Sequence, residues 1–411
     1  MIETVNKVVL PWNAWYEDTF LEISFPEKWQ VDIFSLRGNK PVYSAQLREE
    51  AERMAEILRE RKIQSVAIAI DDLTRPMSYE GFFEYLIPQL ASWKYPPKVK
   101  IIIGLGTHRP LNRQELELKV GKTPFHFLDF VEVINHDYRN DVVPVGLEWG
   151  KVPVKVNRHF MEAQYRVVFS AIVPHPFAGF SGGPKMVLPG LSNIEVTRRT
   201  HQMALMGFVG KIGNVHNNKF RKLLDEFIRK IPVDYFIGFL TDERRQCIYL
   251  QSGELLKTYY DLTDVARRVY TIPRPEALYD VVWLNAYPKD TELLQIDTAF
   301  NPVLSAEEKF WHETTVFVVS AACHKGMGVH DLFGPGGALY RAPREKRLLK
   351  GHPVLFLLPT ISREAFTKVF WEGYQLFNHP EEVILKIEEL FSKPNLRLGI
   401  FPVASIQLTA P

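Results

Sequence analysis

Acidic, basic and imidazole side chains follow short apolar runs in the first half of this chain, and they are types that move protons and bind anions. One run leads into Asp71–Pro76, which contains Asp72 and Arg75, and the next leads into Gly104–Pro110, which contains His108. A histidine titrates near neutral pH, a carboxylate can orient it, and an arginine can hold a carboxylate or phosphate. These segments predict a site that transfers protons on an anionic substrate.

His175 follows a later apolar run, and we expect it to face His108 across one pocket. Two imidazoles so placed suit chemistry that handles protons on both faces of one carbon. Asp72 would then orient one imidazole, and Arg75 would hold the anion. A structural interpretation stays open for each: the histidines as packing residues, and the aspartates as a turn or helix cap.

The segment Ser181-Gly182-Gly183-Pro184-Lys185 combines two glycines with a lysine. Glycines let backbone N–H groups approach a phosphate closely, and the lysine can bind an anion or react as an amine. A plain tight turn is the alternative interpretation. His175 precedes this segment and His201 follows it, which favours a functional loop.

His201 lies in a predicted helix after Arg198-Arg199-Thr200, and no metal-binding residue stands three or four positions after it. Any metal held by His201 would need most of its ligands from something other than the protein. The alternative is a surface or packing histidine.

Short β-branched runs alternate with helical patterns, which is typical of an α/β fold. We predict a helix over 44–62 and strands over 65–70, 98–103, 130–134 and 165–173. In an open α/β sheet, ligands bind at the carboxyl ends of the strands. The candidate residues follow these strands, so the pattern predicts one shared site.

A chain of 411 residues is too long for one ordinary domain. The proline-containing segment 271–280 marks the predicted boundary. We expect an N-terminal catalytic and cofactor-attachment domain over 1–272 and a smaller α/β domain over 276–398, with the active site in the cleft between them. The smaller domain has predicted strands over 281–284, 315–320 and 353–358, and predicted helices over 290–300 and 380–392. The terminal segment 399–411 is expected to return to the first domain.

Composition excludes several classes of protein. Fifty Lys and Arg against 48 Asp and Glu leave a net charge of +2, which favours neither nucleic acid nor an anionic membrane as partner. The longest apolar runs are about half of what a membrane-spanning helix needs. Two cysteines in no metal-binding spacing fit a reducing compartment, so we expect a cytoplasmic protein.

Taken together, the motifs resemble the nickel-dependent lactate racemase family, whose members are 2-hydroxyacid racemases and epimerases. The resemblance covers essentially the whole chain and depends on Asp71–Pro76, Gly106–Pro110 and Pro174–Gly190, followed by His201. The block Pro174–Gly190 is the most specific of these. Their order and spacing agree with the family pattern.

The resemblance implies a nickel-pincer nucleotide, pyridinium-3,5-bisthiocarboxylic acid mononucleotide, attached covalently to Lys185. It also implies that His201 is the protein ligand of the nickel, which accounts for the isolation of this histidine. Cofactor maturation enzymes would then be partners. The implied surroundings of the phosphate and the substrate are Thr74, Arg75, Ser181, Gly182 and Gly183.

The mechanism implied is reversible hydride transfer from the Cα of a 2-hydroxy acid to the cofactor. His108 and His175 would each remove the hydroxyl proton of one enantiomer, and Asp72 would set the tautomer of one of them. Two alternatives remain: a non-catalytic binder of the nickel-nucleotide cofactor, and a metal-dependent hydrolase. The presence of both histidines argues against a binder, which needs no paired bases.

One segment departs from the family pattern. Lactate-acting members carry a Tyr-Gln pair followed three residues later by a lysine that grips the substrate carboxylate, whereas this chain has Leu294, Gln295 and Thr298. Lys289, Arg75 and Lys325 are candidate replacements for the missing cation. We therefore expect Gln295 and Thr298 to contact a 2-hydroxy acid other than lactate, longer or polyhydroxylated.

Overall fold

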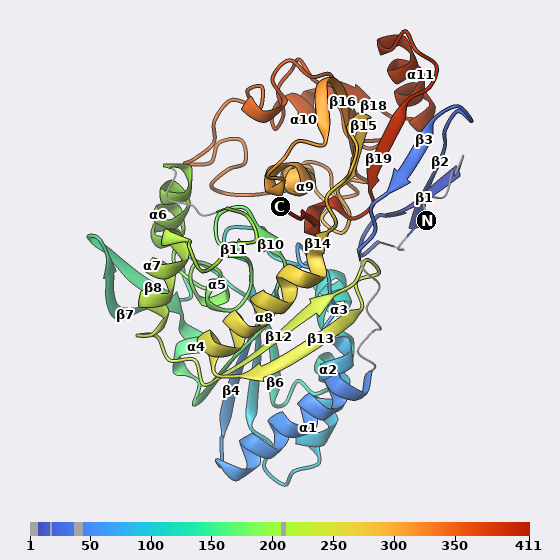
Figure 1. Ribbon diagram of the computed structural model, residues 1–411. Helices are drawn as coiled ribbons and strands as arrows, with labels where there is room; N and C mark the ends of the chain where they lie inside the picture. Colours follow the sequence, from blue (N-terminus) through green and yellow to red (C-terminus); the bar gives the residue numbers. More distant parts are fainter. Residues whose placement is uncertain (1–6, 17–18, 37–43, 207–210) are drawn as a thin grey trace. The chain divides into compact units, whose positions relative to one another are not determined.

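The computed structural model describes residues 7–16, 19–36, 44–206 and 211–411. Its chain forms two compact units (Figure 1). The central unit comprises residues 38–266, and the terminal unit combines residues 1–37 with 267–411. The α/β fold expected from the sequence is confirmed in both.

The central unit is built on a twisted, mostly parallel sheet. Its described strands pair in the order β13-β12-β9-β4-β5-β6, and the β12–β13 pair is antiparallel. Its elements are α1 (Ser44–Glu60), β4 (Ser65–Asp71), α2 (Glu80–Ala91), β5 (Lys98–Gly104), α3 (Arg113–Val120), η1 (Thr123–His126), β6 (Val131–Asn135), β7 (Val142–Trp149), β8 (Val152–Asn157), α4 (Arg158–Glu162), β9 (Tyr165–Ala171), β10 (Pro174–His175), β11 (Gly179–Phe180), α5 (Pro184–Val187), α6 (Ile194–Leu205), α7 (Lys219–Ile228), β12 (Tyr235–Thr241), β13 (Cys247–Gly253) and α8 (Leu255–Tyr270).

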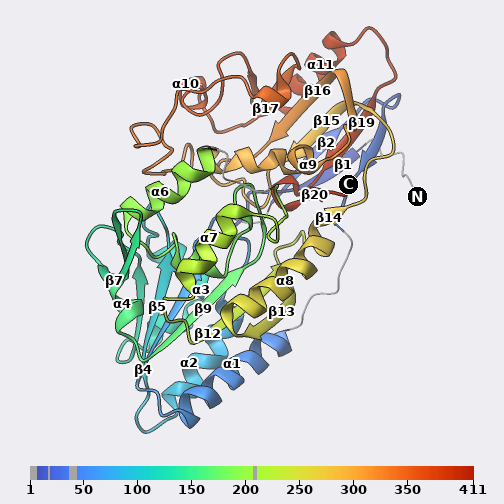
Figure 2. The same ribbon diagram turned by 60° about the vertical axis from the view of Figure 1, so that its left-hand side comes forward.

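Helices α2 and α8 cover opposite faces of this sheet. The ring of Tyr79, next to α2, contacts Phe239 of β12 edge to face. The neighbouring residue of β12 is Gly238, and a Cβ there would come within 2.2 Å of Leu262 of α8. Successive residues of a strand point to opposite faces, so the two helices sandwich the sheet. Figures 1 and 2 show α8 running alongside β12 and β13.

The chain changes direction across this sheet beside β4. From β4 it proceeds to β5 and β6 on one side, and β9 then pairs with the other side of β4. Such a switch point opens a crevice at the carboxyl ends of the strands, where ligands of α/β proteins bind. The side chain of Asp71, the last residue of β4, accepts a hydrogen bond from Ala171 N at 2.8 Å and ties β4 to β9 there.

The terminal unit contains a second parallel sheet, with its described strands in the order β18-β17-β16-β15-β19-β3. One face of the sheet packs against α11 and the hairpin β1–β2, where Val8, Trp283, Leu398 and Ile387 share one core. The elements are β1 (Lys7–Trp12), β2 (Thr19–Ser24), β3 (Gln30–Ile33), β14 (Thr271–Ile272), β15 (Tyr279–Asn285), η2 (Leu293–Phe300), α9 (Asn301–Ser305), β16 (Trp311–Ser320), η3 (Arg347–Leu349), β17 (Val354–Leu357), α10 (Arg363–Thr367), β18 (Gln375–Phe377), α11 (Pro380–Leu390), β19 (Arg397–Phe401), η4 (Ala404–Ile406) and β20 (Leu408–Thr409).

The two units differ from the expected domains at both ends of the chain. Residues 1–37 belong with the C-terminal half, because β3 pairs in parallel with β19 and extends its sheet. The end of the chain stays in the same unit, because β19 also pairs with β15 and β20 pairs with β14. The segment 399–411 thus pairs with β3 and β14, which were expected in the first domain and lie in the terminal unit.

No helix in the described part of the chain combines the length and the apolar character needed to cross a bilayer.

Candidate active site

Asp72 and His108 form a close pair at the carboxyl ends of β4 and β5. His108 Nδ1 lies 2.6 Å from Asp72 Oδ2, while Thr74 donates to Asp72 Oδ1 through its backbone N–H at 3.1 Å and through its hydroxyl. Burial alone would raise the pKa of Asp72, but His108, Arg75 and Thr74 hold it well below its usual range. The ionised carboxylate therefore keeps the proton of neutral His108 on Nδ1 and leaves the lone pair on Nε2.

Arg75 lies beside this pair, half-buried. Its guanidinium donates to the Thr74 hydroxyl at 2.9 Å and to the Thr74 carbonyl at 3.2 Å. Thr74 therefore links Arg75 to Asp72, and its own hydroxyl is used in that link.

A buried lysine that the sequence pattern does not predict to be in the site fixes this loop. Lys119 of α3 is fully buried, and its Nζ lies 2.8 Å from Asp71 Oδ1. The same Nζ donates to the carbonyls of Arg75 at 3.2 Å and Met77 at 3.0 Å. The signal for it was weak, because α3 reads RQELELKV and a lysine in so polar a helix is usually exposed.

His175 and Lys185 form a second pair, after β9. His175 Nε2 lies 2.7 Å from Lys185 Nζ, and His175 Nδ1 accepts hydrogen bonds from the backbone N–H groups of Phe177 at 3.1 Å and Ala178 at 3.3 Å. An Nδ1 that accepts cannot carry a proton, so neutral His175 carries its proton on Nε2. His175 thus presents a donor at the atom where His108 presents a lone pair.

Most polar groups of the glycine-rich loop form hydrogen bonds with neighbouring residues of the protein. The Ser181 hydroxyl accepts from Val173 N at 3.3 Å and donates to Ala171 O at 3.5 Å, and Gly183 N donates to Ser170 Oγ at 2.9 Å. Gly182 and Gly183 have φ of +72° and +50°, and a Cβ on either would lie 2.3 Å from a neighbouring atom. In this arrangement the loop fixes the backbone that presents Lys185.

His201 lies in α6, and its Nδ1 is 2.7 Å from the carbonyl oxygen of Thr197. Desolvation lowers the pKa of His201 to about 4, and positive charge on Lys185 or His108 disfavours its protonation further. At neutral pH the imidazole is therefore uncharged, with the proton on Nδ1 and the lone pair on Nε2, which is the form that binds a metal.

Across the described ranges, no group of three or more His, Cys, Asp or Glu side chains is placed to hold a metal ion. A metal bound by His201 within this part of the chain would thus take most of its donors from a ligand. That requirement agrees with a cofactor that brings its own donor atoms.

The loops that carry these residues meet at one edge of the central sheet. Gly106 N donates to Gly190 O at 3.0 Å, which joins the loop of His108 to the loop of Lys185. His136, directly after β6, has its Nε2 3.2 Å from the carbonyl oxygen of Ser192, which places the start of α6 at the same edge. The structure therefore brings together the predicted site residues of the central unit.

Gln295 and Thr298 lie in η2 of the terminal unit. The Thr298 hydroxyl donates to the Gln295 carbonyl at 2.8 Å, a bond within this 3-10 helix. Of the candidate replacement cations in this unit, Lys289 is 3% exposed, and Lys325 Nζ lies 4.5 Å from the ring centroid of Tyr16. The loop of Lys325 adjoins η2, because Leu293 N donates to Gly326 O at 2.9 Å.

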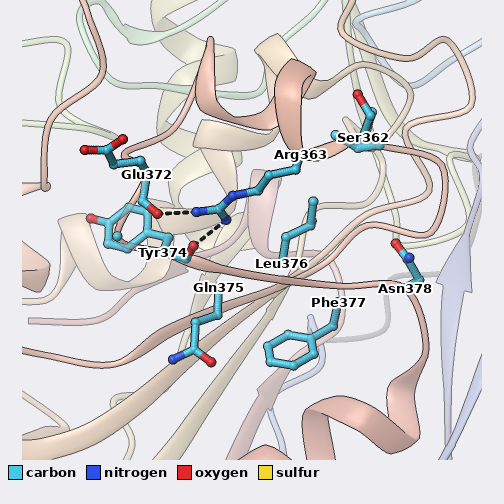
Figure 3. Close-up of a pocket in the computed structure, with 10 residues that line it drawn as sticks. Ser362, Arg363, Glu372, Tyr374, Gln375, Leu376, Phe377 and Asn378 are labelled. Atoms are coloured by element: carbon cyan, nitrogen blue, oxygen red, sulfur yellow. Dashed lines mark hydrogen bonds between the residues drawn. The ribbon is translucent and has the colours of Figure 1, made fainter.

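A surface depression of the terminal unit contains none of the predicted residues (Figure 3). It is lined by residues 361–363 and 372–378. Its arginine, Arg363, donates to the carbonyls of Tyr374 at 2.8 Å and of Glu372. We therefore assign no ligand to it.

Comparison with known proteins yields one family and several relatives. Residues 16–209 match the lactate racemase N-terminal domain. The lactate racemase of Thermoanaerobacterium thermosaccharolyticum is 23% identical over 268 residues, 64% of this chain and 61% of that protein. The lactate racemase of Lactiplantibacillus plantarum is 24% identical over 334 residues, 75% of this chain and 77% of that protein. The match to the first relative thus spans less than two thirds of its length.

Solved structures show the same fold. The lactate racemase apoprotein of T. thermosaccharolyticum superposes with a TM-score of 0.72 at 18% identity, covering 98% of this chain and all of that one. A structural genomics target from Thermotoga maritima gives a TM-score of 0.65 at 19% identity, covering 91% and 100%. Through its matching domain and its two relatives, the chain is similar to the lactate racemases.

Proposed function

We propose that this protein is a racemase or epimerase of a 2-hydroxy acid that uses a covalently attached nickel-pincer nucleotide. The observation that carries the proposal is the Asp72–His108 pair, 2.6 Å apart, at the same sheet edge as Lys185 and His201. Three groups have a role in this chemistry: a base held in one tautomer (His108), an amine (Lys185) and an isolated neutral imidazole (His201). The similarity to lactate racemases supports the same reaction class.

His108 is the base in this proposal. Its Nε2 lone pair takes the proton of the substrate 2-hydroxyl, and the ionised Asp72 stabilises the imidazolium that forms. Arg75, which the Thr74 link fixes beside the pair, holds the substrate carboxylate. These residues need no change of tautomer before they act.

His175 serves the opposite face only after a local rearrangement. Its Nε2 carries a proton while Phe177 N and Ala178 N donate to Nδ1, so it can donate to a substrate oxygen but cannot take a proton there. To act as a base at Nε2 it must move its proton to Nδ1, and both backbone N–H groups must then turn away. The expectation of two equivalent bases is therefore refined to one preformed base and one that must be released.

Lys185 and His201 fit the implied cofactor. Lys185 would carry it through an amide-type bond, and His201 would give nickel one nitrogen ligand, Nε2, while its Nδ1–H bonds Thr197 O. When bound, the cofactor supplies a hydride acceptor that protein side chains lack. The protein orients the substrate and handles the hydroxyl proton.

We propose that the substrate is a 2-hydroxy acid other than lactate, because Thr298 stands where lactate-acting members carry a lysine. A panel of lactate and longer or polyhydroxylated 2-hydroxy acids, assayed by chiral chromatography, tests this. Lactate as the best substrate would contradict it.

The test of the reaction is co-expression with nickel-pincer maturation enzymes, followed by intact mass measurement and a chiral assay. We expect a cofactor-sized adduct that is absent from Lys185→Ala and present in Lys222→Ala, an exposed lysine that serves as the matched control. Nickel content should fall in His201→Ala. With substrate deuterated at C2, the label should stay largely on carbon, because the hydride returns instead of exchanging with solvent.

Two outcomes would contradict the proposal. No adduct, under conditions that load a known family member, would mean that Lys185 does not carry the cofactor. An adduct without interconversion of stereoisomers across the panel would favour a protein that binds the cofactor without catalysis.

A further inference from the structure

We propose that His175 keeps the amine of Lys185 neutral and aimed, which makes Lys185 a nucleophile ready for acylation by an activated carboxyl or thiocarboxyl group. The inference rests on the proposed function, since it concerns how a cofactor would become attached there. It assigns His175 a task that precedes catalysis.

The backbone around His175 determines which tautomer its imidazole adopts. Two backbone N–H groups, those of Phe177 and Ala178, point at Nδ1 from 3.1 and 3.3 Å. A proton on Nδ1 would face both of their hydrogens, so this nitrogen keeps its lone pair. The neutral imidazole must then carry its proton on Nε2. The backbone N–H groups of the turn at 175–178 fix this tautomer.

His175 Nε2 and Lys185 Nζ are in contact at 2.7 Å. With the proton on Nε2, the imidazole donates, and Nζ must accept. An ammonium group has three donors and no acceptor, whereas a neutral amine has a lone pair. This hydrogen bond therefore selects the neutral amine, which is also the nucleophilic form.

The surroundings favour the same protonation state. The Lys185 side chain is partly buried. Partial burial disfavours an ammonium. The backbone holds the amine in place, because Lys185 N donates to Gly182 O at 3.1 Å within the glycine-rich turn.

The reaction that this arrangement prepares is acyl transfer. The Nζ lone pair attacks the carbon of R–C(=O)–X or R–C(=S)–X, the C–X bond breaks, and X leaves with its electron pair. Nζ loses one proton to X or to solvent, so the products are an amide or thioamide and HX, and nothing is oxidised or reduced. The acylated nitrogen is no longer basic, so His175 is released from this contact for its later role.

The test uses the full-length protein without cofactor and a small acylating reagent, the N-hydroxysuccinimide ester of acetic acid. Acetylation of each lysine is followed by peptide mass spectrometry from about pH 6 to about pH 10, with the exposed Lys222 as reference within the same sample. An ordinary lysine has a midpoint near 10.4. We expect the Lys185 midpoint to lie at least about two units lower, so that below both midpoints its free-amine fraction exceeds that of Lys222 by about a hundredfold.

Two variants separate hydrogen bonding from packing. His175→Phe keeps a ring but has no donor, so the Lys185 midpoint should return toward that of Lys222. His175→Gln keeps an N–H donor and should restore part of the shift. A Lys185 midpoint equal to that of Lys222 in the unmodified chain would overturn the inference, and that measurement needs no variant to fold. A shift that survives in a folded His175→Phe variant would assign it to the surroundings and overturn the role of His175.

The experiment distinguishes failure of this inference from failure of the proposed function. A lowered Lys185 midpoint without any adduct on co-expression would leave the nucleophilic lysine standing and contradict the cofactor proposal. An adduct on Lys185 with an ordinary midpoint would do the reverse.

Discussion

Replacing Lys119 by methionine should destabilise the central unit strongly. Lys119 and Asp71 have side-chain exposures of 0% and 6%, and their charged atoms lie 2.8 Å apart. Methionine has a similar length but no charge and no donor. The Lys119→Met variant would leave the Asp71 carboxylate buried without this cation, and the carbonyls of Arg75 and Met77 would lose a donor.

The expected loss follows from the burial of the pair. Removing one partner of a buried ion pair costs about 3–5 kcal/mol, because the remaining charge is left uncompensated. Replacing both partners is much cheaper, so Asp71→Asn with Lys119→Met should recover most of that loss. The recovery also measures the coupling between the two side chains.

Hydrogen–deuterium exchange during urea unfolding measures this change, because peptides from β4 and α3 report the free energy of unfolding of the central unit separately. Lys122→Met, an exposed lysine near the end of the same helix, is the matched control and should change that free energy by less than about 0.5 kcal/mol. A loss below about 1 kcal/mol for Lys119→Met, or no recovery in the double variant, would refute the assignment of a buried ion pair.

Three further predictions concern single residues. Gly183→Ala should lower the free energy of unfolding by about 1–3 kcal/mol in the same urea experiment, because its Cβ would lie 2.3 Å from Tyr259 Cδ2 at a φ of +50°. A change below about 0.5 kcal/mol would show that the turn relaxes freely. Burial lowers the pKa of His136 to about 4, so between about pH 6.5 and pH 4 the unfolded chain binds a proton that the folded chain does not. Stability should therefore fall by about 3 kcal/mol on acidification through that window, and a His136→Gln variant that kept the full slope would contradict this. In the cofactor-loaded enzyme, Asp72→Asn should lower kcat by about 10³-fold or more, since the amide no longer fixes the His108 tautomer; a loss below about tenfold would show that Asp72 is not needed for it.

The parts of the fold that were predictable are those encoded locally. The apolar runs of β4, β5 and β9 gave strand bounds within two residues of those in the structure, since buried parallel strands are continuously hydrophobic. Their order along the chain also indicated that the following loops would share an edge. The pairing of β3 with β19 was not predictable, because it joins residues more than 360 positions apart, as in the contact of Arg397 with Asp32.

The residue types of the candidate site were predictable, but the contacts between them were not. Asp72 and His108 are 36 positions apart, and only the parallel pairing of β4 with β5 brings their loops together. The burial of Lys119 was not predictable, because a lysine in a polar helix normally faces solvent. A buried cation there makes sense only once Asp71 and the carbonyls of the β4 loop are seen to converge on it.

The two histidines look equivalent in the sequence, yet their tautomers should make the two stereochemical directions unequal. His108 takes its tautomer from the remote Asp72 and is ready as a base, whereas His175 takes the opposite one from its own backbone turn. An enantiomer whose hydroxyl faces His175 must displace two N–H contacts on binding, which raises its KM. Because a racemisation has an equilibrium constant of one, kcat/KM must be equal in both directions, so the same enantiomer must show a kcat raised by the same factor. Chiral assays started from each enantiomer measure both constants. Equal KM values in the two directions would mean that the turn at 175–178 has already rearranged in the loaded enzyme.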